Sequence, residues 1–201
     1  MIRIRVFSYQ TLPKKETFDA CLGRSNADAL SQGRRGAALQ ETLTGFRLLA
    51  ELLPEIPLSA VRKDEKGRPF LAGYPEVDFS ITHCKGLVGC AVEQGESPRV
   101  GLDAERLGTQ TERSMQLIAR RWFTPAEQAK FEAEPTEETF LSVWTAKEAA
   151  AKFTGNGLDR FSEPDLAEME CRHYRAGDVI LCAVCRKGVA LPETLEFAEW
   201  N

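Results

Sequence analysis

The same order of hydrophobic patterns runs twice along this 201-residue chain, and it limits the folds that the chain can adopt. Residues 1–10 alternate polar and apolar side chains, which predicts a strand, and residues 37–54 carry leucines at helical spacing. Residues 77–83 and 87–92 then predict two strands joined by a short turn, as in a hairpin. A chain that mixes helices with hairpins in this way is expected to fold as an α+β protein.

The second half of the chain returns to this order of strand, helix and paired strands. Residues 93–98 have the composition of a linker, so we expect one half at 1–98 and another at 99–201. No residue-level repeat accompanies the order, so an internal duplication rests on the succession of elements alone. The second half is expected to contain a strand at 99–105, helices at 111–123 and 136–153, a short helix opened by Thr124, Pro125 and Glu127, and strands at 165–174 and 178–185.

Composition limits the partners. Hydrophobic residues make up 43% and charged residues 28% of the chain, as in ordinary globular proteins. The formal net charge of −4 argues against general binding to nucleic acid or to a membrane surface. No apolar run approaches the ~20 residues that span a bilayer, and the N-terminus lacks the apolar stretch of a signal peptide. We therefore expect a cytoplasmic protein that binds neither nucleic acid nor membrane.

Six cysteines raise the question of a metal site or a disulfide framework. Cys182 and Cys185 form a Cys-x-x-Cys pair, but residues three apart on a strand point to opposite faces. There is no second pair of this kind, and the histidines are His83 and His173 alone. The sequence therefore favours free, mostly buried thiols in a reducing compartment over zinc or disulfides.

Asp103 and Glu105 form the first candidate for chemistry. If the strand at 99–105 continues to its end, both carboxylates project from the same face. Two neighbouring carboxylates repel one another unless a cation lies between them, and Mg²⁺ binds a few carboxylates while leaving positions for substrate phosphates. The alternative is a strand that ends in acidic residues next to a helix N-terminus, whose dipole favours negative charge.

The helix at 136–153 is the second candidate. Trp144, Glu148 and Lys152 follow at spacings of four and share a face, and Lys147 lies in the neighbouring stripe. Alanines around them leave room for another backbone or a ligand. The alternative is a surface ion pair between Glu148 and Lys152, worth ~0.3 to 0.5 kcal/mol. Gly155 follows, which allows a positive φ beyond the helix end.

The hairpin is the third candidate. Its first strand ends at His83, and Lys85 lies in the turn that follows, which makes an anion site plausible. Lys66 and Arg68 add positive charge in a turn earlier in the same half. The alternatives are a structural histidine at a strand end and solvated charge in a turn.

Taken together, these motifs resemble the 4′-phosphopantetheinyl transferases, specifically the longer, surfactin-synthetase-activating type. That family shows a Gly-basic-Pro turn, a Phe-x-x-Ser-His strand end, a Gly-(Ile/Val)-Asp-x-Glu strand and a Trp-(Ser/Thr)-x-Lys-Glu-(Ala/Ser)-x-x-Lys helix near a Gly. The matching residues, in family order between about 67 and 158, are Gly67-Arg68-Pro69, Phe79 to His83, Gly101 to Glu105, Trp144 to Lys152 and Gly155.

The departures from the family pattern mostly keep the chemical type. The family often has an Arg ahead of a Leu-x-Gly segment in the N-terminal helix, where it holds a phosphate of coenzyme A. Glu41 lies near that place here, so Arg34 or Arg35 substitutes for it, or the contact is missing. The conservative departures are Leu102 for Ile or Val, Arg68 for Lys and Thr82 for Ser.

The resemblance implies an enzyme that transfers the phosphopantetheine arm of coenzyme A onto a serine of a carrier protein and releases adenosine 3′,5′-bisphosphate. It implies that Asp103, Glu105 and Glu148 hold Mg²⁺, with Mn²⁺ as a substitute, against the diphosphate of coenzyme A. The base that activates the serine would be Glu148 or a metal-bound water, and we favour Glu148. Asp103, Glu148 and Lys152 are then the expected catalytic residues.

The resemblance also implies a pseudo-dimer, in which two similar α+β halves, each a small antiparallel sheet packed on a long helix, share one site at their junction. Lys152 would bind the transferred phosphate, while His83 and Arg68 would secure the nucleotide end. Lys147 is expected to face the same cleft. Coenzyme A would be bound by these four residues.

The implied partner is an acyl or peptidyl carrier protein, an acidic helical domain, and the chain is expected to be a monomer. The basic and aromatic segment 118–123, with Arg120 and Arg121, is the expected docking surface. Two other functions remain open: a Mg²⁺-dependent diphosphate hydrolase, and a non-catalytic module that binds coenzyme A or a carrier protein. The presence of all three carboxylates and Lys152 speaks against the binding module.

Overall fold

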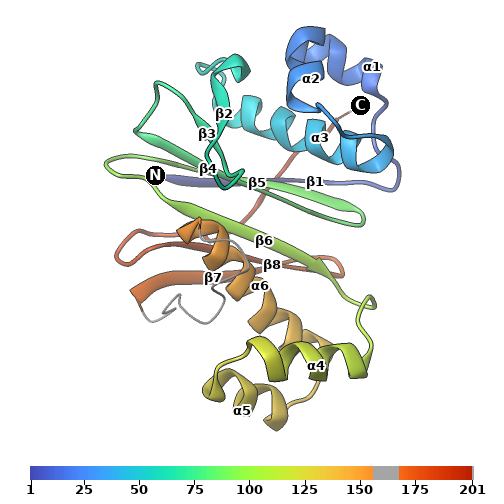
Figure 1. Cartoon of the computed structure of the whole chain (residues 1–201), viewed down its shortest axis with the longest axis vertical. Helices are drawn as coiled ribbons and strands as arrows, with labels where there is room; N and C mark the ends of the chain where they lie inside the picture. The colour runs from blue at the N-terminus through green and yellow to red at the C-terminus, as the bar shows by residue number, and fades with distance from the viewer. Residues whose placement is uncertain (156–167, 201) are drawn as a thin grey trace.

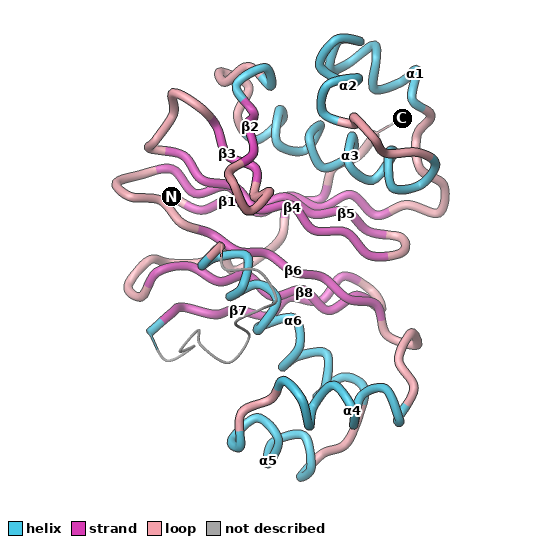
Figure 2. Tube along the Cα trace, in the orientation of Figure 1, coloured by secondary structure: helices cyan, strands magenta, loops and turns pink. Residues whose placement is uncertain are grey.

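A computed structural model describes residues 1–155 and 168–200 of the chain. The described residues fold as an α+β protein, as the sequence predicts, with helices at two ends and the main sheets between them (Figures 1 and 2). In this part of the chain, no helix is both long and apolar enough to cross a membrane.

The first sheet has the strand order β4-β5-β1-β9. The predicted hairpin is confirmed, because β4 and β5 pair antiparallel around a turn at Lys85 and Gly86. The long helix α3 packs on one face of this sheet, and near the C-terminus β9 returns to pair with β1 in parallel. The elements are β1 (Ile2–Ser8), α3 (Gly36–Leu52), β4 (Val77–Cys84), β5 (Leu87–Gln94) and β9 (Glu196–Phe197).

The second sheet has the order β6-β8-β7, and α6 packs on its outer face (Figure 1). The helix predicted at Thr124 is confirmed, with the Thr124 side chain and Glu127 forming a capping box. The strand expected at 165–174 is described from 169, and its first residues lie outside the described residues. The elements are β6 (Val100–Arg106), α4 (Glu112–Trp122), α5 (Pro125–Ala133), α6 (Glu137–Thr154), β7 (Met169–Ala176) and β8 (Val179–Arg186).

The sequence did not predict the elements between β1 and α3, or those just after α3. The polar stretch before α3 folds into short helices because its few apolar residues, Phe18, Leu22 and Ala27, are buried in the core that contains α3. A small hairpin of β2 and β3 carries Arg68 in its turn. These elements are α1 (Lys15–Phe18), the π-helix η1 (Asp19–Gly23), α2 (Arg24–Leu30), the 3₁₀-helix η2 (Leu58–Ala60), β2 (Val61–Lys63) and β3 (Pro69–Leu71).

The two main sheets pack face to face, so the molecule has four layers: α3, the first sheet, the second sheet and α6. Ile2, Ile4 and Val6 of β1 point toward the second sheet, and they are buried against apolar residues of β6 and β8 such as Leu102 and Leu181. Because alternate residues of a strand face opposite sides, the remaining residues of β6 face α6. That side of β6 carries the acidic pair.

Candidate functional site

The period of β6 decides where its acidic residues point. Leu102 and Ala104 are buried between the two sheets. Asp103 and Glu105 therefore share the opposite face, as predicted, and Asp103 contacts a residue of α6. Gly101 lies on this face as well, where an added Cβ would be 1.9 Å from a backbone oxygen of α6. The glycine thus brings the helix axis close to the acidic strand.

The sequence of α6 matches this close approach. Ala146 and Ala149 are buried against β8, where larger side chains would hold the helix away from the sheet. The helix ends at Gly155, whose φ of 72° lies in the left-handed region and whose N–H bonds the Ala151 carbonyl at 3.0 Å. The predicted positive φ at Gly155 is confirmed. Lys152 therefore lies in the last turn, above the acidic strand.

Lys152 is the centre of the contacts at this junction. Its Nζ donates to Asp103 Oδ1 at 2.8 Å, to the Leu102 carbonyl at 3.0 Å and to Thr82 Oγ1 at 3.2 Å. The Thr82 hydroxyl also donates to Asp103 Oδ1 at 3.3 Å. The second oxygen, Oδ2, is buried and has no hydrogen-bond partner among the described residues. Asp103 therefore carries more acceptor capacity than its neighbours satisfy.

Burial and the charge of Asp103 raise the pKa values of Glu105 and Glu148. Burial and then the charge of Asp103 raise the pKa of Glu105 to about 7, while Lys152 opposes the shift. The pKa of Glu148 rises to about 7, again mainly through burial and Asp103, with a smaller contribution from Glu105. The structure therefore brings together the carboxylates of β6 and α6, with one ammonium group to offset three potential negative charges.

This cluster suits a hard cation chemically. It offers oxygen ligands only, one of them a buried and unpaired oxygen of Asp103, and excess negative charge. The three carboxylates are not drawn tightly together, however. In the described part of the chain, the ligand set whose atoms all lie within 4.8 Å of one another consists of cysteines and a histidine instead. Of the three carboxylates, Asp103 is the one that forms an ion pair with the Lys152 ammonium group.

Arg68 lies at the same junction but is fully engaged. Its guanidinium binds both carboxylate oxygens of Asp78, at 2.9 and 2.7 Å, and donates to the carbonyls of Lys152 at 3.1 Å and Val100 at 3.3 Å. The Arg68 side chain is 14% exposed and that of Asp78 is 7% exposed. Arg68 thus ties the β2–β3 hairpin to β4, β6 and the end of α6. Its predicted contact with a nucleotide stays a prediction.

His83 lies on the other face of β4, toward α3. Its Nδ1 is 3.4 Å from Glu41 Oε2, and the Tyr9 hydroxyl donates to Glu41 Oε1 at 3.0 Å. Burial raises the pKa of Tyr9 to about 12, and Glu41 adds to the effect. The acidic residue found where the family has an arginine is therefore the partner of His83. Arg34 and Arg35, its candidate substitutes, are exposed at the start of α3.

Lys147 points away from the cluster, in contrast to the expectation that it faces the cleft. Its side chain is 4% exposed, and its Nζ is 2.9 Å from Glu127 Oε2 on α5. Glu127 Oε2 also accepts the Thr124 N–H at 2.7 Å. One residue along a helix turns the side chain by about 100°, which separates Lys147 from Glu148. Lys147 ties α6 to α5.

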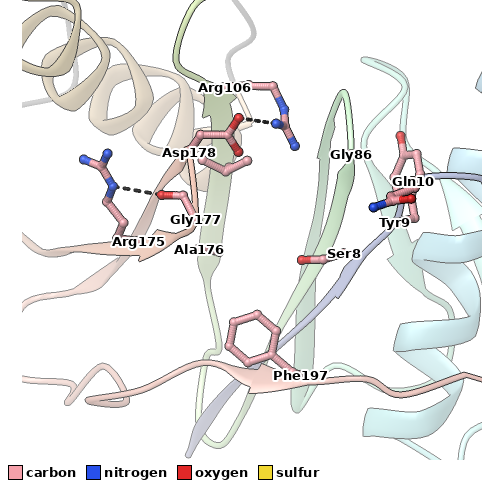
Figure 3. Close-up of a pocket in the computed structure, with 11 residues that line it drawn as sticks. Ser8, Tyr9, Gln10, Gly86, Arg106, Arg175, Ala176, Gly177, Asp178 and Phe197 are labelled. Carbon is pink, nitrogen blue, oxygen red and sulfur yellow. Dashed lines mark hydrogen bonds and ion pairs between the residues drawn. The ribbon is translucent and has the colours of Figure 1, made fainter.

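A pocket of about 440 Å³ opens where the two sheets meet, at the end of β6 (Figure 3). Tyr9 and Gly86 line it from the first half, and Arg106 and Asp178 from the second. Arg106 forms an ion pair with Asp178 and also donates to the Lys85 carbonyl. The pocket therefore lies one residue beyond Glu105, beside the turn that follows His83.

The second half of the chain matches a known protein family. The family model described as the 4′-phosphopantetheinyl transferase superfamily matches residues 99–188. That segment contains Asp103, Glu105, Glu148 and Lys152, the residues that the fold brings together.

The second half of this chain is therefore similar to the 4′-phosphopantetheinyl transferase superfamily. A 4′-phosphopantetheinyl transferase of Bacillus subtilis is 33% identical over 97 residues, and the 4′-phosphopantetheinyl transferase HetI of Nostoc sp. is 30% identical over 110 residues. These matches cover 47% and 52% of this chain, and 40% and 45% of those relatives, so the chain spans less than half of their length. The 4′-phosphopantetheinyl transferase psf-1 of Bacillus pumilus is 26% identical over 183 residues, which covers 78% of this chain and 75% of that protein.

Sequence reasoning overlooked the role of β4 in positioning the site. Asp78 Oδ2 accepts the Val100 N–H at 2.9 Å, and Ser80 Oγ accepts the Leu102 N–H at 3.0 Å. Thr82, two residues further, contacts Asp103 and Lys152. These polar residues recur with a period of two in a strand whose other face is apolar, which is the signal that could have identified them. The face that they form aligns β6 beneath β4.

Proposed function

We propose that this chain transfers the 4′-phosphopantetheine group of coenzyme A to a serine hydroxyl of an acyl or peptidyl carrier protein. The serine oxygen forms a bond to the β-phosphorus of the diphosphate, the bond from that phosphorus to the bridging oxygen breaks, and adenosine 3′,5′-bisphosphate leaves. The serine proton passes to a base of the enzyme. The observation that carries the proposal is the electrostatic coupling of Asp103, Glu105 and Glu148 with Lys152, which pairs with Asp103, within the segment that matches the superfamily.

Asp103, Glu105 and Glu148 would hold Mg²⁺, or Mn²⁺ in its place. The buried, unpaired oxygen of Asp103 and the raised pKa values of both glutamates indicate that this cluster favours added positive charge. When bound, the cation would neutralise charge on the diphosphate oxygens.

Lys152 and Glu148 would act on the substrates directly. The Lys152 side chain is one-third exposed, so its ammonium can reach a phosphate oxygen while it still bonds Asp103. A raised pKa of about 7 suits Glu148 as a general base, because such a carboxylate is basic enough to take the serine proton near neutral pH. Thr82 would orient Lys152 through its hydroxyl.

We further propose that the chain is a monomer whose two similar halves form a pseudo-dimer. The halves 1–98 and 99–201 would each contribute one sheet and one long helix, α3 or α6, with coenzyme A at their junction. The supporting feature is a glycine at each helix–strand contact. An added Cβ at Gly45 of α3 would lie 2.5 Å from the Ile81 side chain of β4. In the second half, an added Cβ at Gly101 of β6 would likewise meet the backbone of α6. His83 would secure the nucleotide end of coenzyme A. Arg68 would support the junction through Asp78.

The carrier protein would dock on α4. Arg120 and Arg121 are exposed near its C-terminus, and the Arg121 guanidinium lies 4.9 Å from the centre of the Trp122 ring. Leu117, also exposed on this helix, would add apolar contact. Basic residues around an apolar side chain complement an acidic helical domain.

The test is intact-mass spectrometry of apo carrier proteins incubated with the chain, coenzyme A and Mg²⁺. The proposal predicts a gain of one phosphopantetheine on the carrier's serine. Glu148→Gln and Asp103→Ala should fold and fail to transfer, whereas the exposed Glu132→Gln serves as the matched control with normal transfer. Release of free phosphopantetheine without a carrier would indicate a diphosphate hydrolase, and binding of coenzyme A without turnover would indicate a binding module. Either result overturns the proposal.

A further inference from the structure

A second cluster of ligand groups lies on the same sheet, apart from the carboxylates. Cys171 and His173 of β7 and Cys182 of β8 bring two sulfurs and one ring nitrogen within 4.8 Å of one another. The sulfurs of Cys171 and Cys182 are 3.1 Å apart. Cys182 is buried, while Cys171 and His173 are exposed, so a solute can reach the cluster from the β7 side.

The register of the sheet explains why these residues meet. His173 pairs directly with Cys182, and Cys171 pairs with Val184, so Cys171 lies diagonally from Cys182. Directly opposed residues of antiparallel strands share a face, and Cys182 contacts Ala146 and Ala149 of α6 on that face. The sequence could not show this, because the three residues form no recognisable spacing motif.

The protonation state of His173 suits it as a metal ligand. Its Nε2 lies 2.7 Å from the carbonyl oxygen of Ser142 on α6. A carbonyl only accepts hydrogen bonds, so Nε2 carries the proton and the free lone pair lies on Nδ1. Partial desolvation of the ring lowers the pKa of His173, which favours this neutral form. In many metal sites, the ring nitrogen that does not bind the metal donates such a hydrogen bond, and this fixes the orientation of the histidine ring.

We propose that Cys171, His173 and Cys182 form a site for a thiophilic divalent cation, with Zn²⁺ as the best fit. Two thiolates and one imidazole are soft and borderline ligands, which favour Zn²⁺ and not the Mg²⁺ expected at the carboxylates. Binding would release one proton from each thiol to the solvent. The fourth tetrahedral position would be open to water or an external ligand.

The distances also favour a cation over a disulfide. Zn–S bonds of about 2.3 Å place two sulfurs roughly 3.8 Å apart in a tetrahedral site, so the pair needs to open by only about 0.7 Å. A disulfide requires Cα atoms closer than about 7 Å. Diagonal pairs across an antiparallel ladder lie roughly 7–8 Å apart, which is unfavourable for that bond.

This site lies next to the carboxylate cluster but does not depend on it. Cys182 pairs with Asp103 across β6 and β8, so the two clusters occupy neighbouring strands on the same face of the sheet. The experiment must therefore separate cation binding at sulfur from cation binding at oxygen. A thiolate-specific signal does so, with excess Mg²⁺ present to occupy the carboxylates.

The experiment titrates Co²⁺ into the reduced full chain and follows the thiolate-to-metal charge-transfer absorption, with Zn²⁺ then displacing Co²⁺. The wild type should bind one equivalent. Cys171→Ser and Cys182→Ala should each weaken binding at least about tenfold. Cys185→Ala is the matched control, because Cys185 is a buried cysteine of the same strand that faces the other sheet, and it should bind normally.

Three results would overturn the proposal. The first is a wild type without a charge-transfer band. The second is equal binding by wild type and Cys171→Ser, which is informative because that exposed position tolerates the change without unfolding. The third is loss of two free thiols on mild oxidation with no cation uptake by the reduced chain, since that outcome assigns the pair to a disulfide.

Discussion

Replacing Glu148 with glutamine should stabilise the metal-free protein at alkaline pH. The folded-state pKa of Glu148 is about 7, raised from 4.5 by burial and by Asp103. Below pH 4.5 the carboxyl is protonated in both folded and unfolded chains. Between pH 4.5 and 7 only the unfolded chain loses the proton readily, so the stability of the wild type falls as the pH rises. Above pH 7 the folded chain carries the full cost of the charge, which glutamine does not carry.

The magnitude follows from the size of the shift. A rise from 4.5 to about 7 corresponds to about 3 kcal/mol in a dry site. Because Glu148 is only partly buried, solvent screening reduces this to about 1 to 2 kcal/mol. For a chain of this size, Glu148→Gln should then raise the melting temperature by about 2 to 6 °C at pH 8.

The assay is thermal unfolding followed by circular dichroism at pH 5 and pH 8, in the presence of a chelator. The difference between Glu148→Gln and the wild type should be largest at pH 8 and about fourfold smaller at pH 5. Glu132→Gln, a change at an exposed glutamate of α5, should show no difference at either pH. Addition of Mg²⁺ should reduce the gap at pH 8 by stabilising the wild type. A variant that is no more stable than the wild type at pH 8 would refute the electrostatic reasoning.

Three further changes test the packing around the site. Gly101→Ala places a Cβ 1.9 Å from the Ala149 carbonyl oxygen, so denaturant unfolding should show that the free energy of unfolding falls by about 3 kcal/mol or more. Near-normal stability would mean that α6 does not lie this close to β6. Arg68→Ala leaves the buried Asp78 carboxylate unpaired, so the free energy of unfolding should fall by about 3 to 5 kcal/mol in the same assay. Unchanged stability together with a raised KM for coenzyme A would instead show that Arg68 binds the ligand. Lys147→Met should keep the kcat of transfer to a carrier protein, because its ammonium bonds α5, and a loss of kcat in a folded variant would return Lys147 to the cleft.

The order and type of the main elements could be predicted from the sequence because their patterns are long and regular. β1, the β4–β5 hairpin, α3 and α6 each have a clear period, and Thr124, Pro125 and Glu127 identify a helix start. The short helices before α3 could not be predicted. They contain too few apolar residues to show a period, and they form because those residues find a partner in α3.

The candidate site was predictable in its members but not in its arrangement. The spacing in β6 and α6 places Asp103 with Glu105 and Glu148 with Lys152, but no local pattern shows that Lys152 bonds Asp103. The partners of the other charged residues were hidden for the same reason. Asp78 and Glu127 lie on other elements, so their pairing with Arg68 and Lys147 depends on the tertiary fold.

The most direct test of the account is Mn²⁺ binding, followed by electron paramagnetic resonance of the free ion, in Asp103→Asn, Glu148→Gln and the double variant. If carboxylates from β6 and α6 hold one cation together, each single change should weaken binding by about tenfold or more. The double change should cost less than the two single losses combined, because both residues serve one site. Mn²⁺ affinities equal to that of the wild type in both single variants would contradict the account.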